Sequence, residues 1–227
     1  MVLLCYIEIV NMDTSRILVV GDIHAPFEHK DYLDHCKGVA KFYKTTHTVI
    51  IGDEIDNHYS SFHETNPDGY GAGEELDKAM EALADYHKAF PHADVILGNH
   101  NRIIERKLSA GGLSKRWMRG YSDVLGVPTW RYETSRLYDG VMYIHGEGVT
   151  ARTRALREGR SVVQGHRHTE GYVWYNPMPT KQIFGMQVGT GIDSSAYAFA
   201  YAKDHPLPVL SCGVVVGGKR AYLEPML

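Results

Sequence analysis

Short runs of apolar and often β-branched residues recur along the chain, and most of them end in glycine followed by polar residues. Runs of this length between turn-forming residues are typical of strands that are buried on both faces. The pattern therefore predicts five strands, at residues 17–20, 48–51, 94–97, 141–144 and 161–163.

Helical patterns lie between several of these runs. They cover residues 30–43, 74–90, 102–108 and 114–125. Strands that alternate with helices predict an α/β fold, in which helices surround a mixed, mostly parallel central sheet. After Gly165 the pattern changes to apolar segments without helices, and Gly217 and Gly218 separate the last two of them. The chain is therefore predicted to end in antiparallel hairpins. These segments are residues 172–175, 182–188, 209–216 and 220–223.

The length of 227 residues suits a single domain, since one hydrophobic core remains practical up to about 250–300 residues. We assign residues 16–227 to that domain. Residues 1–15 are interpreted as an N-terminal extension or an extra edge strand, and the sequence leaves both alternatives open. The irregular stretch 57–73 is too long for a simple connection, so it is predicted to be a functional loop.

The composition is ordinary for a folded soluble protein, with 44% hydrophobic residues, 22% charged residues and a formal net charge of −3. The apolar N-terminal segment is interrupted by Glu8 and is far shorter than the ~20 residues that span a bilayer, so no membrane association is expected. Cys5, Cys36 and Cys212 are odd in number and widely spaced, which argues against a disulfide framework and a thiolate zinc site. These features predict a reducing, cytoplasmic location.

Polar residues that can bind metal or transfer protons follow each of the five predicted strands. In an open α/β sheet such groups converge at the carboxyl ends of the strands, although they are scattered in sequence. A single Asp or His after a strand is usually a turn former or a satisfied polar group, but five such groups at five strand ends are hard to obtain by accident. The groups contain Asp22 and His24, Asp53 and Asp56, Asn99 and His100, His145, and His166 and His168.

These groups offer carboxylate, amide and imidazole donors and no cysteine. Such a donor set suits divalent ions such as Mn, Fe, Zn or Ni. Asp22 and His24, like His166 and His168, are two positions apart, so an extended strand end points both members of a pair to one side. The sequence therefore predicts a metal site at this edge of the sheet.

In this order along the chain, the motifs GDIH, GDEID, GNH, HG and GHRH resemble those of the calcineurin-like metallophosphoesterase superfamily, from residue 17 to the C-terminus. The resemblance implies an α/β/β/α sandwich and a phosphoesterase with two divalent metal ions, with manganese preferred over iron, zinc or nickel. It implies ligands for one ion at Asp22, His24 and His168, ligands for the other at Asn99, His145 and His166, and a bridging carboxylate at Asp53.

The resemblance also implies that His100 stays free of metal and acts as a general acid, held in the useful tautomer by Asp56. Two departures limit what can be carried over. Asn101 stands where the third motif usually continues with an acid, and Asn57 replaces the arginine of Ser/Thr protein phosphatases, so protein-phosphatase activity is not expected. His58, in the long loop, is interpreted as solvated rather than as a phosphate contact, and so is His63.

Positive charge is concentrated around the third and fourth motifs. Residues 101–160 contain twelve Lys or Arg against six Asp or Glu, whereas residues 1–100 contain seven against seventeen. We interpret this asymmetry as the footprint of a phosphate-rich substrate, with solvated helix faces as the alternative. The candidate substrate contacts are Arg102, Arg152, Arg154 and Arg157.

Trp117 and Trp130 lie among these charges, and each either stacks on a base or belongs to the core. The favoured hypothesis is a phosphoesterase that hydrolyses mono- or diesters of nucleotides or nucleic acid. The first alternative is a phosphatase or diesterase of small non-nucleotide phosphates, whose activity ignores the base and tolerates high salt. The second is a scaffold that has kept the fold as a binding surface.

Overall fold

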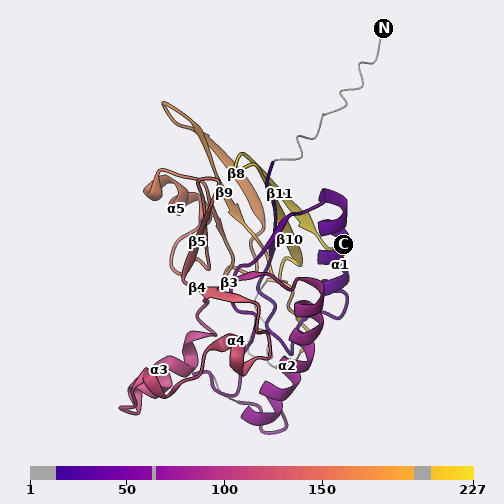
Figure 1. Cartoon of the computed structure of the whole chain (residues 1–227), viewed down its shortest axis with the longest axis vertical. Coiled ribbons are helices and arrows are strands. Elements are labelled where there is room, and N and C mark those ends of the chain that lie inside the picture. Colours follow the sequence, from indigo (N-terminus) through magenta and orange to yellow (C-terminus); the bar gives the residue numbers. More distant parts are fainter. Residues whose placement is uncertain (1–13, 63–64, 197–205) are drawn as a thin grey trace.

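The computed structural model describes residues 14–62, 65–196 and 206–227, which form two mixed β-sheets with helices on their outer sides (Figure 1). One sheet has the strand order β11-β10-β1-β2-β3-β4, and the other has the order β5-β6-β7-β9-β8. The first sheet contains β1 (Arg16–Val20), β2 (His47–Ile50), β3 (Asp94–Ile96), β4 (Arg131–Glu133), β10 (Ser211–Val216) and β11 (Arg220–Pro225). The second contains β5 (Ser135–Tyr138), β6 (Val141–Ile144), β7 (Val162–Gln164), β8 (Tyr172–Pro177) and β9 (Gln182–Gln187).

Strand directions agree with the change of pattern along the sequence. Strands β1 to β4 pair in parallel, and so do β6, β7 and β9. The C-terminal part forms the predicted antiparallel hairpins, β8 with β9 and β10 with β11. The helices are α1 (Tyr32–Tyr43), α2 (Ala72–Ala89), α3 (Arg102–Ala110), α4 (Tyr121–Val124) and α5 (Ala151–Glu158), with a 3-10 helix η1 (Lys115–Trp117).

The alternation of side chains along the strands separates three apolar layers. In β1, Leu18 and Val20 belong to a cluster with residues of α1 and α2, whereas Ile17 and Val19 pack with the second sheet. On the far side of the second sheet, Val162 packs with residues of α5. Figure 1 accordingly shows α1 and α2 on one side of the strands and α5 on the other. The α/β/β/α sandwich is confirmed.

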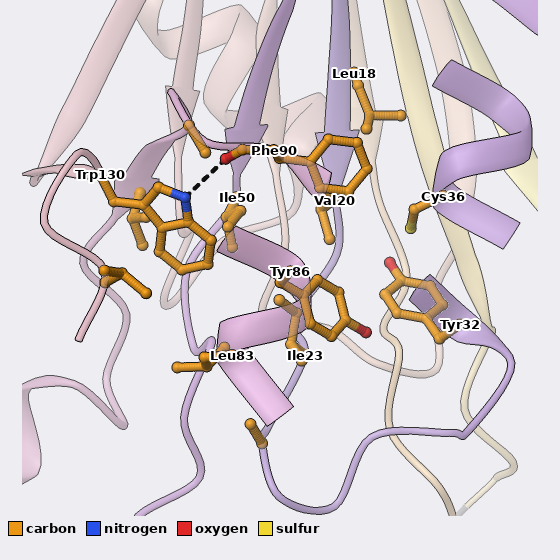
Figure 2. Close-up of a cluster of buried hydrophobic side chains, with 14 of the residues drawn as sticks. Leu18, Val20, Ile23, Tyr32, Cys36, Ile50, Leu83, Tyr86, Phe90 and Trp130 are labelled. Carbon is orange, nitrogen blue, oxygen red and sulfur yellow. Dashed lines mark hydrogen bonds between the residues drawn. The ribbon is translucent and has the colours of Figure 1, made fainter. Parts of the chain in front are cut away.

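The largest apolar layer lies between the first sheet and its two helices (Figure 2). Tyr32 of α1 and Tyr86 of α2 are buried there. Trp130 is also buried, and its Nε1–H donates a hydrogen bond of 2.8 Å to the carbonyl oxygen of Phe90. Of the two alternatives for Trp130, stacking on a base or packing in the core, the structure therefore shows the second.

The structure differs from the sequence prediction in four elements, and one of them is α5, which the sequence did not predict. The helix expected over residues 114–125 is divided into η1 and α4, because the backbone is extended at Met118 (ψ 142°) and Gly120 (ψ 149°). Glycine has a low helix propensity, which favours the break. Strands β4 and β5 were not expected, because they are short and partly exposed and contain no continuous apolar run.

Residues 1–13 of the predicted extension or edge strand, residues 1–15, lie outside the described residues. In the described part, Cys36 and Cys212 are buried and free. None of the helices described is both long enough and apolar enough to cross a membrane.

Candidate metal centre

The first group of predicted ligands lies where β1 meets the loop after β7. Asp22 and His24 are buried, and His168 is half-buried beside them. The Nε2 atom of His168 lies 3.2 Å from Asp22 Oδ2 and 3.1 Å from Nε2 of His24. One donor atom from each of these residues falls within 4.8 Å of the other two. Three residues that are up to 146 positions apart in sequence thus point their donor atoms at one place.

A buried hydrogen bond sets the orientation of His24. Its Nδ1 lies 2.6 Å from Oδ1 of Asp56, so Nδ1 carries the proton and Nε2 directs its lone pair toward His168. Metal-binding histidines commonly hold their second nitrogen in this way. Burial lowers the pKa of His24, which favours the neutral imidazole that a metal ligand requires.

The second group lies beside the first, at the ends of β2, β3, β6 and β7. His145 Nδ1 is 3.1 Å from the carbonyl oxygen of Ile51, which leaves Nε2 directed at Oδ2 of Asp53, 2.9 Å away. The side-chain oxygen of Asn99 lies 3.0 Å from the same nitrogen. Asp53, His145 and His166 also offer donor atoms within 4.8 Å of one another. The structure therefore brings all seven predicted ligands into two adjacent groups.

Three of these residues have a strained backbone. His24 (φ 57°), Asp53 (φ 47°) and His166 (φ 70°) lie in the left-handed region, which costs a non-glycine residue about 1–3 kcal/mol. Such conformations persist where the surrounding structure imposes them, and they concentrate at functional sites. All three belong to the two groups of predicted ligands.

Two motif glycines are explained by close approach of the carboxylates. A Cβ atom at Gly98 would lie 2.0 Å from Oδ1 of Asp53, and one at Gly165 would lie 2.2 Å from Oδ1 of Asp22. Neither distance is compatible with van der Waals contact. The glycines of GNH and GHRH thus leave room for the two acids that form the groups.

The donor atoms fit divalent metal ions. Neighbouring ligands around an octahedral ion held at about 2.1 Å lie about 3 Å apart, and the four contacts between donors given above measure 2.9–3.2 Å. Among the described residues, the buried Oδ1 of Asp22 has no hydrogen-bond partner. Carboxylate, amide and neutral imidazole donors match Mn, Fe, Zn or Ni.

The two groups are also electrostatically coupled. Burial raises the pKa of Asp53, but the charges of His145 and His100 outweigh this effect and hold that pKa well below its usual range. Burial lowers the pKa of His145, and the charges of Asp53 and Asp22 outweigh this and raise it to about 9. Asp53 is therefore ionised at neutral pH, as a metal ligand has to be.

A family model for calcineurin-like phosphoesterases matches residues 15–189. The chain belongs to this family. Solved structures that resemble it include vacuolar protein sorting 29 from Cryptosporidium parvum, at 11% sequence identity and a TM-score of 0.48, covering 94% of this chain and 98% of that chain. Another is YfcE, a phosphoesterase from E. coli, at 15% identity and a TM-score of 0.40, covering 88% and 87%. No curated protein sequence matches this chain.

Membership of the calcineurin-like phosphoesterases supports a metal-dependent activity on phosphate esters, and the two donor groups are compatible with divalent metal ions. The assignment of single residues to single ions, and of Asp53 as the bridge, stays a prediction.

His100 lies next to the first group, with its ring centre 4.6 Å from that of His24. The family resemblance predicts that Asp56 holds His100 in its useful tautomer, and in the structure the nearest contact with His100 is made by the main chain of Asp56. The Nδ1 atom of His100 donates to the backbone carbonyl of Asp56, and the carboxylate, 3.5 Å from the same nitrogen, makes its short contact with His24 instead. Asp56 therefore holds His100 through its main chain and a predicted metal ligand through its side chain.

Asn101 replaces the acid of the usual motif, and its surroundings explain why an amide fits. Its buried side-chain oxygen accepts hydrogen bonds from the N–H groups of Gly98 (2.8 Å) and Asp53 (3.3 Å). Its Nδ2 donates to Oε1 of Glu54 at 2.8 Å. Burial raises the pKa of Glu54 to about 7. An ionised carboxylate at position 101 would repel that of Glu54 whenever Glu54 is ionised, whereas the amide joins the second and third motifs without repulsion.

The sequence missed a buried carboxylate behind the loop that follows β2. Glu75 of α2 accepts the N–H of His58 at 2.5 Å with one oxygen and the N–H of Tyr59 at 2.8 Å with the other. His58 was expected to be solvated, but it is buried, with Nδ1 4.0 Å from Oδ2 of Asp56. His63 lies outside the described residues. No spacing signal links Glu75 to this loop, because it is simply one acid of an amphipathic helix.

Of the four arginines predicted to contact substrate, Arg102 lies nearest the centre. Its Nε donates to the carbonyl oxygen of Gly98 at 3.0 Å, and it lines a cavity of about 570 Å³ together with Asn99. The other three belong to α5, which packs on the outer face of the second sheet. There the guanidinium of Arg152 lies 5.1 Å from the ring centre of Trp174, and Arg154 donates to the carbonyl of Glu147 at 3.0 Å. The lining of the cavity includes none of the three.

Proposed function

We propose that this calcineurin-like phosphoesterase hydrolyses mono- or diesters of nucleotides or nucleic acid with the help of two divalent metal ions. The supporting observation is the pair of adjacent donor groups, in which seven Asp, Asn and His side chains from five strand ends converge. No part of the proposal depends on a single residue pair, because each group offers at least three donors.

In this proposal, Asp22, His24 and His168 would hold one ion, Asn99, His145 and His166 would hold the other, and Asp53 would be the ligand common to both. When bound, two such ions lower the pKa of a water molecule and clamp the phosphoryl oxygens during in-line displacement. We expect manganese, with iron, zinc or nickel as the other candidates.

His100 is proposed as the general acid. Its Nδ1–H is bonded to the carbonyl of Asp56, which fixes the ring, so Nε2 is the nitrogen that gives a proton to the leaving oxygen. Asn57 also holds His100 in place, because its Nδ2 donates a hydrogen bond to the backbone carbonyl of His100 at 3.1 Å.

The nucleotide or nucleic-acid substrate rests on the excess of positive charge in residues 101–160. We also expect a cytoplasmic location, from the unpaired cysteines. A phosphatase of small non-nucleotide phosphates remains the alternative within the same chemistry, and a metal-free scaffold is the alternative of another class. Substrate preference distinguishes the first alternative, and metal content distinguishes the second.

The test combines metal analysis with a screen of aryl phosphate mono- and diesters in the presence of Mn. We expect up to two metal ions per chain and hydrolysis that a chelator abolishes. Asp53→Asn should lose most of this activity, because a neutral amide compensates the charge of two cations poorly.

Asp34→Asn is the matched control, since Asp34 is exposed and its ion pair in the described part of the chain is with Lys37 on its own helix. Wild-type turnover with two bound ions in Asp53→Asn would exclude the bridging role. A purified wild-type chain that binds no metal and hydrolyses no ester would instead support the scaffold.

A further inference from the structure

One segment of the chain concentrates positive charge away from the sheets. We call residues 101–120, which include α3 and η1, the basic arm. In Figure 1, α3 extends away from the strands. The arm contains one acid, Glu105, and six cationic residues, which are Arg102, Arg106, Lys107, Lys115, Arg116 and Arg119.

Part of this charge is already compensated. Lys115 pairs with Glu105, and Arg102 pairs with Glu147. Among the described residues, Arg106, Lys107 and Arg116 form no ion pair with a carboxylate within 4.0 Å. These three side chains therefore offer charge that an anionic partner can neutralise.

Exposed aromatic rings accompany these cations. The side chain of Phe62 is 64% exposed, and its ring centre lies 4.5 Å from the guanidinium carbon of Arg106 and 5.4 Å from Nζ of Lys107. Trp117 of η1 is 82% exposed, next in sequence to Arg116. Large aromatic side chains bury a large apolar area when they pack against a partner. Aromatic rings that alternate with cations are typical of surfaces that bind single-stranded nucleic acid.

The cavity of about 570 Å³ connects the arm with the metal centre. Arg106, Ser109 and Lys115 line it on the arm, and the predicted ligand Asn99 lines it at the centre. Glu105 and Glu147 also lie in its wall, but each is paired with a cation of the arm. The nine residues of α3 extend over about 13 Å, which is longer than one phosphate group. A chain of phosphates matches this length better than a small ester.

We propose that the basic arm binds single-stranded nucleic acid and directs it through this cavity toward the metal centre. Arg106, Lys107 and Arg116 contact phosphates, and Trp117 stacks on a base. A duplex fits less well, because its bases are already stacked and withdrawn from such a ring. This inference deepens the proposed function and names its substrate class, but binding to the arm can be measured without hydrolysis.

The test measures binding of a fluorescent single-stranded oligothymidylate, and of a duplex of equal length, to the full chain by anisotropy. EDTA prevents turnover, and a series of salt concentrations gives the dependence of affinity on salt. The arm variant is Arg106→Gln/Lys107→Gln/Arg116→Gln. The α5 control is Arg152→Gln/Arg154→Gln/Arg157→Gln, which removes the same charge from the three predicted substrate contacts that lie outside the cavity. A third variant, Trp117→Ala, probes stacking alone.

We expect tighter binding of the single strand than of the duplex. The slope of log affinity against log salt is negative, and in the arm variant its magnitude should decrease by about 2, since each lost contact with a single strand contributes about 0.7. The α5 control should keep the wild-type slope. Trp117→Ala should weaken binding about tenfold with the slope unchanged.

Equal slopes in the arm variant and the wild type, or a loss confined to the α5 control, would overturn the proposal. The proposal would also fail if duplex and single strand bound equally well and Trp117→Ala had no effect on binding. The surface would then recognise any polyanion. Hydrolysis of aryl phosphates by the wild type tests the proposed function separately. A chain that binds the single strand but cleaves nothing would therefore disprove that function and leave the arm assignment standing.

Discussion

The most demanding consequence of the structure concerns Glu75, which belongs to no sequence motif. Both of its carboxylate oxygens accept backbone N–H groups, from His58 and Tyr59, just after Asp56 and Asn57. Those two residues in turn hold His100, through the carbonyl of Asp56 and the side chain of Asn57. Glu75 is therefore a positioning residue for the proposed general acid, two steps away from it.

Replacement by glutamine preserves the shape of the side chain but only one of its acceptors. The amide nitrogen of Glu75→Gln then faces a backbone N–H, so one hydrogen bond to a charged group is lost. Such a bond contributes about 1.5–3 kcal/mol, and the N–H left behind is partly buried. We expect a local loss of about 2–3 kcal/mol. Since 1.4 kcal/mol corresponds to a factor of ten, exchange of the amide protons of His58 and Tyr59 should accelerate roughly 30- to 150-fold.

Hydrogen–deuterium exchange measures this loosening directly, and steady-state kinetics on an aryl phosphate measure its consequence. We expect kcat to fall by roughly tenfold with KM little changed, because misplacement of a catalytic group by less than 1 Å is sufficient for such a loss. Glu74→Gln is the control, since the neighbouring Glu74 is exposed and lies 3.9 Å from Lys78. Unchanged exchange at His58 and Tyr59 in Glu75→Gln, or the same acceleration in Glu74→Gln, would refute the reasoning.

Two further predictions separate the roles of the neighbouring residues. His100→Asn should keep its metal content and lower kcat by roughly 10²–10⁴, with a smaller loss for esters that have acidic leaving groups; loss of a metal ion in this variant would contradict the assignment. Asp56→Asn should instead weaken metal binding about 10- to 100-fold, measured by titration with Mn, because its carboxylate orients His24. Wild-type metal affinity together with a defect limited to kcat would show that Asp56 acts on His100 after all.

The layers of the fold and the location of the site were predictable because both depend on local patterns. Buried strands such as β1 and β2 are continuous apolar runs, and the polar residues after them must meet at one edge of the sheet. The family match and the sandwich agree with this reasoning. Edge strands β4 and β5 escaped it, because they lie where one face is solvated and the apolar run is absent.

The hydrogen bonds around the ligands were not predictable, because they join distant segments whose relative placement only the packed fold determines. Asp56 illustrates the difference. Its motif position suggested a histidine partner, but three histidines lie within 4.0 Å of its carboxylate. The choice between the nearest two, His24 and His100, depends on distances of 2.6 Å and 3.5 Å. Asn101 is a second example. This residue departs from the usual motif because its amide donates a hydrogen bond to the buried carboxylate of Glu54. A sequence motif therefore identifies which side chains meet, whereas the orientation of each one depends on buried partners such as Glu54 and Glu75 that belong to no motif.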